Sequence, residues 1–535
     1  MTPPQDDLSM GCAVFPRLVV SGLSGGGGKT LLSLGLARAL RQRGREVVPY
    51  KKGPDYIDAA WLGLAARRRA VNLDPFFLPD ERLLALFQHA FRMENGQTPA
   101  DRVAVIEGNR GLYDGRDAAG SCSTARLARA LDAPVILALN CTKMTRTAAA
   151  VVAGLAAFEP VRLAGVVLNQ VGSARHGRLA RQAIESHTGI PVLGEIPRLA
   201  ENPIPERHMG LLSVHAERED AAERENTPGA ADESCAGRHA GTVEAVLDGL
   251  AALINESCDV PALLDLACAA PPLQEAPPFW PKNEVENGAE ASGNAEAAFR
   301  FPLPETTRPQ ETDAGTARPP AARRAIRPPR PRIGYVRDAA LWFYYEENLE
   351  ALRRAGAELA ELTLDDGAPW PDLDGLYLGG GFPEMLAASI SASPRLADIR
   401  VLSEQNRPIY AECGGLMILC RTLRVGGADF PMADIFPARA EFCPKPQGLG
   451  YVEAEVTAAN PFHPAGARFR GHEFHYSRCV PLDDLACALA LHPGRGITGQ
   501  GNDGLLHRRV FAAYTHIFAP AVPHWATRFV AACRG

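Results

Sequence analysis

The organising segment of this chain reads Arg17-Leu-Val-Val-Ser-Gly-Leu-Ser-Gly-Gly-Gly-Gly-Lys-Thr30. Its apolar start, residues 18–20, is typical of a buried parallel strand. Leu32, Leu36 and Leu40 then recur on one face of the helix that should follow. The glycines therefore stand at a helix N-terminus, where free backbone N–H groups and the helix dipole favour a phosphate. We expect a strand, a phosphate-binding loop and a helix, which is the opening unit of a P-loop domain.

The loop predicts the contacts of a nucleotide. Backbone N–H groups would surround the phosphates, Lys29 would reach the β and γ oxygens, and the Thr30 hydroxyl would bind Mg²⁺. Leu23 stands where the motif has its first glycine, and Ser24 stands where partition ATPases carry a second lysine. The loop therefore resembles that of the dethiobiotin synthetase group, which activates carboxylates. The alternative is a flexible glycine turn without a ligand. The expected nucleotide-binding residues of this loop are Gly25, Gly26, Gly27, Gly28, Lys29 and Thr30.

Length and composition limit the classes of protein. A chain of 535 residues is too long for one core and predicts about three domains or two large ones. A net charge of −6 argues against a nucleic-acid surface. There is neither a signal peptide nor an apolar run of ~18 residues, so we expect a cytoplasmic protein with no membrane contact. The twelve cysteines form no C-x-x-C pair, which predicts reduced thiols.

Further apolar strands follow the P-loop unit and alternate with helical stretches. This order predicts an α/β fold with a doubly wound, mainly parallel sheet. Because such sheets bind ligands at the carboxyl ends of their strands, the polar residues there are candidate site residues. The expected strands are residues 18–20, 46–50, 102–107, 134–139, 163–168 and 192–194.

Several of these strands end in or before carboxylates. Mg²⁺ prefers oxygen ligands, so Thr30, Asp55 and Glu107 are expected to bind it together with ATP and water. Asp58 and Asp114 are expected to contact a substrate. The alternative for Asp55 and Asp58 is an ordinary Gly-Pro turn with Asp caps. Asn169, at a strand end, is expected to read the adenine edge, although Asn is also a common turn former.

The chain is expected to divide into two domains and a linker. Residues 271–331 contain 13 prolines and few large apolar side chains. Such a segment cannot bury enough surface to offset its ordering entropy. Residues 242–266 have helical apolar spacing and should close the first domain. We expect domains at 16–268 and 332–535, joined by a disordered Pro-rich linker at 269–331.

The C-terminal half contains a candidate nucleophile. In residues 408–417, a strand leads to Cys413 and two glycines before a helix. Such an elbow is expected to expose the sulfur and, through the helix N-terminus, to lower its pKa. Backbone N–H groups of Gly380, Gly381 and Gly414 are expected to stabilise an oxyanion. His516, near the chain end, is the expected base, with His472 and His475 as alternatives.

Taken together, these motifs resemble the cobyrinate a,c-diamide synthase family, and residues 332–535 resemble class I glutamine amidotransferases with a flavodoxin-like α/β fold. The resemblance implies that acetate side chains of a tetrapyrrole are amidated with ATP and with ammonia from glutamine, with Mg²⁺ as cofactor. It assigns metal and substrate roles to Asp55, Asp58, Glu107 and Asp114, and Tyr56 of the same motif joins the substrate contacts. The residues that carry the N-terminal resemblance are 53–58, 72–74, 107–108, 111–115, 123–125, 168–169, 171–173, 175–176 and 205–208.

One position departs from the amidotransferase pattern. Class I enzymes usually have a glutamate two residues after the histidine, whereas this chain has Phe518. The resemblance therefore implies a Cys413–His516 dyad, with Glu473 as a candidate orienter from outside the motif.

The substrate stays open at this point. Cobyrinate, amidated at its a and c acetates, is the first choice, and sirohaem or nickel-sirohydrochlorin is the alternative because Asn109-Arg110 and Lys51-Lys52 depart from the expected pattern. A partition-type P-loop regulator fused to a non-catalytic amidotransferase-like module is a second alternative, against which Ser24, Cys413 and His516 all count. The expected partners are the tetrapyrrole, ATP and glutamine, and a homodimer is a possible assembly.

Overall fold

The structure is a computed structural model, and it describes residues 12–92, 102–201, 203–204, 237–280, 330–365 and 369–535. The described residues up to Phe279 and from Pro331 onward belong to one compact unit. Residues 205–208, which carry part of the resemblance, lie outside the described residues, as does most of the expected linker.

The N-terminal region is built on a seven-stranded sheet in the order β4-β3-β5-β2-β6-β7-β8. Every neighbouring pair in this sheet is parallel. Strand β2 is buried along its whole length, as a central parallel strand covered on both faces should be. The sheet therefore confirms the predicted fold class and adds the short strand β4. The strands are β2 (Arg17–Gly22), β3 (Glu46–Lys52), β4 (Val71–Leu73), β5 (Arg102–Glu107), β6 (Val135–Asn140), β7 (Leu163–Val171) and β8 (Val192–Pro197).

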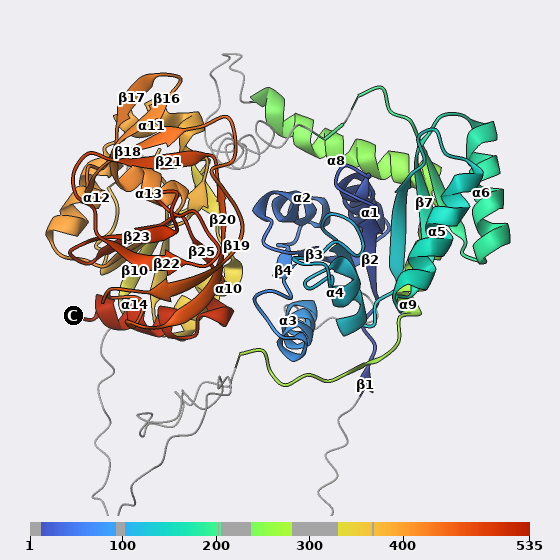
Figure 1. Ribbon diagram of the computed structural model, residues 1–535, viewed down its shortest axis with the longest axis horizontal. Coiled ribbons are helices and arrows are strands. Elements are labelled where there is room, and N and C mark those ends of the chain that lie inside the picture. The colour runs from blue at the N-terminus through green and yellow to red at the C-terminus, as the bar shows by residue number, and fades with distance from the viewer. Residues whose placement is uncertain (1–11, 93–101, 202, 205–236, 281–329, 366–368) are drawn as a thin grey trace, which may run out of the picture. The chain divides into compact units, whose positions relative to one another are not determined.

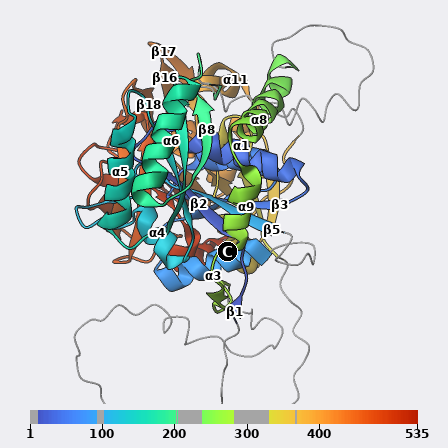
Figure 2. The same cartoon turned by 90° about the vertical axis from the view of Figure 1, so that its right-hand side faces the viewer.

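Helices cover both faces of this sheet. Figure 2 shows α5 and α6 on one side of β2, and α1, α8 and α9 on the other. Helix α1 begins at Lys29, directly after the glycines, so the loop does lie at a helix N-terminus. The helices are α1 (Lys29–Gln42), α2 (Tyr56–Ala66), α3 (Asp80–Arg92), α4 (Thr124–Ala130), α5 (Arg146–Phe158), α6 (Ala174–Thr188), α8 (Gly237–Ser257) and α9 (Val260–Cys268).

The helical stretch expected at the end of this region is present, whereas the expected start of the linker is corrected. Residues 242–266 form parts of two helices, because Asp259 caps a new helix through the N–H of Ala262. The expected linker began at residue 269, but β9 (Leu273–Gln274) pairs with β1 (Cys12–Ala13). The Gln88 side chain bonds the backbone at both Gln274 and Ala276, and these bonds hold the segment to α3. Residues 269–279 therefore belong to the N-terminal region.

The C-terminal region contains a ten-stranded mixed sheet in the order β12-β10-β13-β15-β24-β23-β22-β19-β20-β25. The first five strands are parallel, and the pairs from β24 to β25 are antiparallel. These strands are β10 (Arg332–Val336), β12 (Glu358–Leu362), β13 (Gly375–Leu378), β15 (Ile409–Glu412), β19 (Gly448–Val456), β20 (Arg468–His475), β22 (Cys487–Leu491), β23 (Asn502–His507), β24 (Val510–Ala513) and β25 (His516–Ile517).

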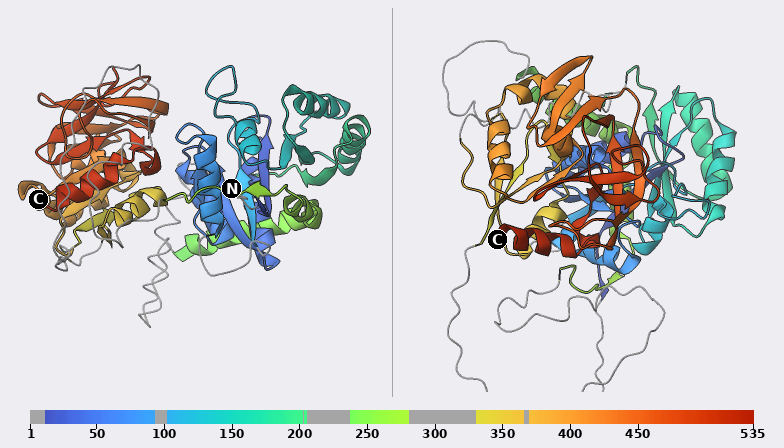
Figure 3. Two further views of the ribbon diagram at one scale, coloured as in Figure 1. Left: turned by 90° about the horizontal axis from the view of Figure 1, so that it is seen from below. Right: turned by 60° about the vertical axis from the view of Figure 1, so that its left-hand side comes forward.

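Smaller sheets and helices flank the large sheet (Figure 1). Helix α14 lies beside α10, as the red and yellow helices in the left view of Figure 3 show. The remaining strands are β11 (Leu341–Phe343), β14 (Gly380–Gly381), β16 (Cys420–Val425), β17 (Ala428–Pro431), β18 (Phe436–Phe442) and β21 (Ser477–Pro481). The helices are α10 (Glu346–Arg354), η3 (Pro383–Leu386), α11 (Ala387–Ala392), α12 (Arg395–Glu404), α13 (Gly414–Leu419), η4 (Ala519–Ala521) and α14 (His524–Cys533).

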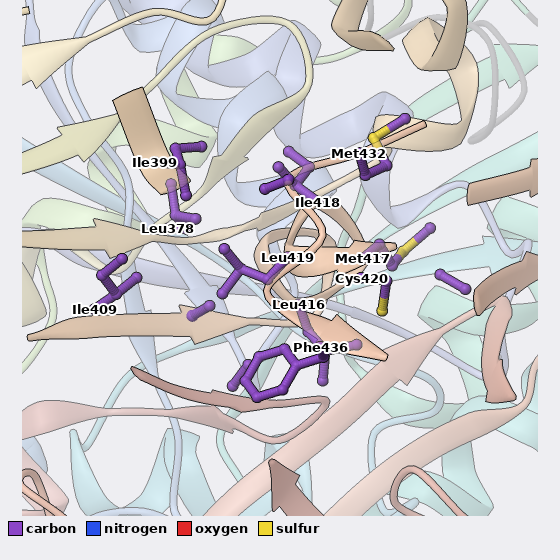
Figure 4. Close-up of a cluster of buried hydrophobic side chains, with 14 of the residues drawn as sticks. Leu378, Ile399, Ile409, Leu416, Met417, Ile418, Leu419, Cys420, Met432 and Phe436 are labelled. Carbon is purple, nitrogen blue, oxygen red and sulfur yellow. The ribbon is translucent and has the colours of Figure 1, made fainter. Parts of the chain in front are cut away.

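The core of the C-terminal region surrounds the helix that follows Cys413. All six residues of α13 are buried. Figure 4 shows Leu416, Ile418 and Leu419 of this helix among side chains from β15 and β18, including Ile409 and Phe436. Because so much apolar surface fixes α13, the backbone at its first residue is held in place.

Candidate active site

The phosphate loop closes on itself through Lys29, whose Nζ lies 2.7 Å from the backbone oxygen of Ser24. Gly28 has a φ of 95°, in the left-handed region that favours glycine. A Cβ there would lie 2.1 Å from Nδ2 of Asn169, so the position also has no room for a side chain. These contacts give the loop a compact shape.

Asn169 contacts the same loop. Its Nδ2 donates to the backbone oxygen of Gly27 at 3.2 Å, and its Oδ1 accepts from the N–H of Gln170. The side chain is buried, so it supports the phosphate loop from the end of β7. Its expected contact with adenine stays a prediction.

The predicted magnesium ligands Thr30 and Glu107 lie together. The Thr30 hydroxyl donates to Oε1 of Glu107 at 2.8 Å. Glu107 is fully buried, and its Oε2 has no hydrogen-bond partner among the described residues. Asp55 lies in the next loop, where its Oδ1 caps α2 by accepting from the N–H of Asp58. The described residues contain no group of three or more His, Cys, Asp or Glu side chains placed to hold a metal ion.

The prediction from sequence missed the cation of this cluster, Lys51. Its Nζ lies 3.0 Å from Oε1 of Glu107 and 2.7 Å from Oδ2 of Asp58, and the side chain is 1% exposed. Burial by itself would lower the pKa of Lys51, but Glu107, Asp58 and Asp55 together raise it above its ordinary value. Burial raises the pKa of Glu107, against the effect of Lys51. A pair of lysines at the end of a strand, directly before the Gly-Pro-Asp turn, was the available signal.

The other expected substrate residues lie apart from this cluster. Asp114 is exposed, and its Oδ2 accepts from the N–H of Gly111 at 2.8 Å. Tyr56 is buried, and its ring stacks on Phe343 with ring centres 4.8 Å apart. Its ring centre is also 5.4 Å from that of His516. The substrate contacts of both residues stay predictions.

Cys413 occupies a sharp turn between β15 and α13. Its φ of 47° and ψ of −99° are strained for a residue with a side chain. The Cys413 N–H donates to the oxygen of Ala513 at 2.7 Å, which ties the turn to β24. This geometry is that of a nucleophile elbow.

The Cys413 sulfur was expected to be exposed and to have a lowered pKa, and both expectations were wrong. Cys413 is 3% exposed, and burial raises its pKa well above the ordinary value, with Glu384 and Glu412 adding to the rise. Helix α13 has only six residues, so its N-terminus offsets little of this cost. The resting sulfur therefore carries its proton, and a base must remove it.

Three histidines lie near the end of the large sheet. His516 and His472 are ladder partners on β25 and β20, and their rings stack with centres 4.9 Å apart. His475 stacks on Tyr514 instead, and its Nε2 lies 3.6 Å from Oε1 of Glu473. A Cβ on Gly380 would lie 2.4 Å from Cε1 of His516. Of the three, His516 is thus the histidine in contact with a predicted oxyanion glycine.

Glu473 was expected to orient His516, but it lies beside His475 instead. Its carboxylate accepts from the N–H groups of Arg495 and Gly496 and faces His475. The carboxylate beside His516 is Glu412, whose Oε2 lies 3.5 Å from Nδ1 of His516. Sequence reasoning missed Glu412 because it immediately precedes the cysteine, where it could be taken for the last residue of a buried strand.

The three predicted oxyanion glycines also come together. A Cβ on Gly414 would lie 3.0 Å from the backbone nitrogen of Gly381. Strand β14, which contains Gly380 and Gly381, pairs with β11 and so presents these residues beside the elbow. Their role as donors to an oxyanion stays a prediction.

Residues from the two halves of the chain touch around Tyr56, within the single compact unit. The Tyr56 ring contacts Phe343, Tyr345, His472 and His516. The Tyr451 hydroxyl donates to the Asp74 carboxylate, at 2.9 Å from Oδ2. Arg470 donates to the backbone oxygen of Phe76 at 2.8 Å. The segment that carries Asp55 and Asp58 therefore reaches the catalytic histidine candidate.

Comparison with known families matches the two regions separately. The model described as the CobQ/CobB/MinD/ParA nucleotide binding domain matches residues 18–212. The model described as the CobB/CobQ-like glutamine amidotransferase domain matches residues 332–522. Fold and site thus define a glutamine amidotransferase joined to a P-loop nucleotide-binding domain.

Relatives that align with nearly the whole chain identify the family within this class of enzymes. A cobyrinate a,c-diamide synthase from Magnetococcus marinus is 38% identical, covering 96% of this chain and 96% of the relative. Synthases of the same name from Dehalococcoides mccartyi and Methanothermobacter thermautotrophicus are 34% and 33% identical, each covering 96% of this chain and 98% of the relative. The chain belongs to the cobyrinate a,c-diamide synthase family. Within the described part of the chain, no helix combines the length and apolar character needed to cross a membrane.

Proposed function

We propose that this protein amidates the a and c acetate carboxylates of cobyrinate, using ATP and ammonia released from glutamine. The observation that supports the proposal most is that the strained turn at Cys413 and the P-loop with its buried Glu107 lie in one compact unit. Family membership supports the choice of substrate.

At the first centre, the Cys413 sulfur attacks the side-chain amide carbon of glutamine while His516 accepts the thiol proton. N–H groups at Gly380, Gly381 and Gly414 stabilise the oxyanion. His516 then returns the proton to the leaving ammonia. Water hydrolyses the remaining thioester and releases glutamate.

At the second centre, ATP phosphorylates a substrate carboxylate, because a free carboxylate is a poor electrophile and an acyl phosphate is a good one. Ammonia attacks the acyl phosphate and phosphate leaves. Lys29 holds the transferring phosphoryl group, and positioning provides most of the rate. Lys51 offsets the negative charge of Glu107 and Asp58 beside the loop.

The residues present fit a magnesium ion as cofactor. Glu107 offers an unpartnered buried oxygen among the described residues, and the Thr30 hydroxyl lies against the same carboxylate. These two side chains would hold the ion, with Asp55 acting through water. A bound Mg²⁺ would neutralise charge on the phosphates of ATP. We also propose a cytoplasmic location, which the free thiols of ten of the described cysteines support.

The proposal is tested by incubating the protein with ATP and amide-nitrogen-15 glutamine, and separately with cobyrinate, sirohaem and nickel-sirohydrochlorin. Mass spectrometry of each tetrapyrrole should find two labelled nitrogens in cobyrinate alone. Labelling of sirohaem or nickel-sirohydrochlorin would instead select the alternative substrate. A partition-type regulator would hydrolyse ATP and release no glutamate. Lys29→Ala should abolish amidation with either glutamine or ammonium salts as the nitrogen donor.

A further inference from the structure

Glu412 lies directly beside the catalytic histidine candidate. Its Oε2 is 3.5 Å from Nδ1 of His516, and the two side chains are 1% and 0% exposed. At that distance the carboxylate contacts the imidazole without a closed hydrogen bond, and catalytic hydrogen bonds commonly tighten only in the substrate complex. In a buried site this carboxylate acts on the imidazole with little screening by water.

The carboxylate of Glu412 is fixed at both oxygens. Oε1 accepts from the backbone N–H of Ile517 at 3.1 Å, and Oε2 accepts from the Tyr377 hydroxyl at 3.1 Å. Tyr377 is fixed in turn by Nδ2 of Asn348 at 3.2 Å. Because Ile517 is the neighbour of His516, the same strand that presents the imidazole also binds the carboxylate.

We propose that Glu412 is the positioning residue of the glutaminase centre and replaces the glutamate that class I enzymes carry two residues after the histidine. Its carboxylate keeps a proton on Nδ1 of His516, which leaves Nε2 to accept the proton of the Cys413 thiol. As the sulfur–carbon bond forms, the proton moves to Nε2 and the imidazolium faces an anion. The inference rests on the proposed function, since it needs glutamine hydrolysis at Cys413.

The other groups around His516 leave this role to Glu412. His472 stacks on the ring, and burial together with His516 lowers the pKa of His472 well below its ordinary value, so it is neutral. Tyr56 contributes its ring to the same surroundings. The carboxylate of Glu384 acts on the Cys413 thiol. Glu473 faces His475.

The test compares Glu412→Gln, which keeps the shape of the side chain, with Glu473→Gln as the matched control. In Glu412→Gln, kcat for glutamate release should fall by about 10²- to 10⁴-fold, as when the orienting carboxylate of a catalytic triad becomes an amide. The KM for glutamine and the ammonium-dependent amidation should stay near their wild-type values. Glu412→Asp should restore part of kcat, and Glu473→Gln should keep it.

The pH profile adds a readout that a purely structural role would not move. Without the anion that stabilises the imidazolium, the acidic limb of kcat/KM for glutamate release should move to lower pH in Glu412→Gln. Unchanged kcat, or a limb that stays in place, would overturn the proposal.

If Glu412→Gln lost ammonium-dependent amidation as well, the fold would be disturbed, and Tyr377→Phe would replace it as the test. This variant removes one donor to Oε2, so kcat should fall by less than in Glu412→Gln, and the acidic limb should move to higher pH because the hydroxyl no longer offsets part of the carboxylate charge. If Tyr377→Phe changed neither kcat nor the acidic limb, the proposal would again be overturned. Glutamate release without cobyrinate amidation would reject the proposed acceptor while leaving Glu412 testable, and a wild-type protein that releases no glutamate would refute both.

Discussion

Cys413 combines a strained backbone with a thiol that resists ionisation. Its φ of 47° holds the sulfur at the turn between strand and helix, while burial, Glu384 and Glu412 raise its pKa. A protonated resting thiol is compatible with the proposed catalysis, in which His516 would remove the proton only as the sulfur attacks. The residue therefore depends on its neighbours for reactivity.

Replacing Cys413 by Ala should separate the two half-reactions. Glutamine-dependent amidation should be lost, whereas amidation with ammonium salts should persist because the P-loop centre is intact. Paired assays with the two nitrogen donors measure this. Cys420→Ala is the matched control, since Cys420 is another buried thiol of the same region. Full glutamine use by Cys413→Ala would mean that another residue is the nucleophile.

At the P-loop centre, the residue that depends on its neighbours is Lys51, which lies between Glu107 and Asp58. Lys51→Met should abolish amidation from both nitrogen donors, because Glu107 and Asp58 would lose the cation at 3.0 Å and 2.7 Å. Removing one partner of a buried ion pair leaves an uncompensated charge and costs about 3–5 kcal/mol, so unfolding should be measured alongside ATP hydrolysis. Lys51→Arg should recover part of the stability. Wild-type ATP-dependent amidation in Lys51→Met would contradict a role for Lys51 at this centre.

Strand β14 lies close to His516 because its residue Gly380 has no side chain. Gly380→Ala should reduce glutamate release strongly, since its Cβ would lie 2.4 Å from Cε1 of His516 and displace the ring. Ammonium-dependent amidation should be kept. Gly427→Ala is a control for a glycine change with open space around it, although its φ of 87° will cost some stability. Equal glutamate release by Gly380→Ala and wild type would contradict the predicted contact.

Helix α10 contains a buried acid that makes stability depend on pH. Burial, with Glu346 and Glu350 nearby, raises the pKa of Glu347 to about 8 from the ordinary 4.5. The folded state therefore holds this proton where the unfolded chain has lost it, and stability falls as pH rises from about 4.5 to about 8. Denaturant unfolding should show that Glu347→Gln gains stability over wild type towards pH 8, by roughly 4 kcal/mol at most. Equal pH dependence of the two proteins would exclude this effect.

At the scale of the whole molecule, Tyr56 joins the two centres. It lies between Asp55 and Asp58 in sequence, yet its ring packs on Phe343 and His516. Tyr56→Ala should uncouple the reactions, so that more glutamate is released than amide is formed, because the ring of the N-terminal region that packs on His516 would be lost. Tyr56→Phe keeps the ring and should remain coupled. The two products are measured in one reaction mixture, and a matched yield in Tyr56→Ala would argue against the coupling.

Local patterns were enough to predict much of this protein. The strand that precedes the glycines, the phosphate loop with Lys29 and Thr30, and the elbow at Cys413 depend on short-range chemistry: apolar periodicity, glycine conformations and helix N-termini. The seven-stranded parallel sheet followed from the alternation of strands and helices. These features could be inferred because neighbouring residues in sequence are also neighbours in these elements.

The partners of the proposed catalytic groups could be identified only in the folded chain. Lys51 meets Glu107 because β3 and β5 are adjacent and in register. Glu412 meets His516 because β15 pairs with β24, which directly precedes the segment carrying the histidine. Burial of Cys413 reversed the expected direction of its pKa. Residue types and spacing thus predicted which chemistry the chain carries. Strand pairing and burial decided which charges face one another, because both arise from contacts between distant parts of the chain.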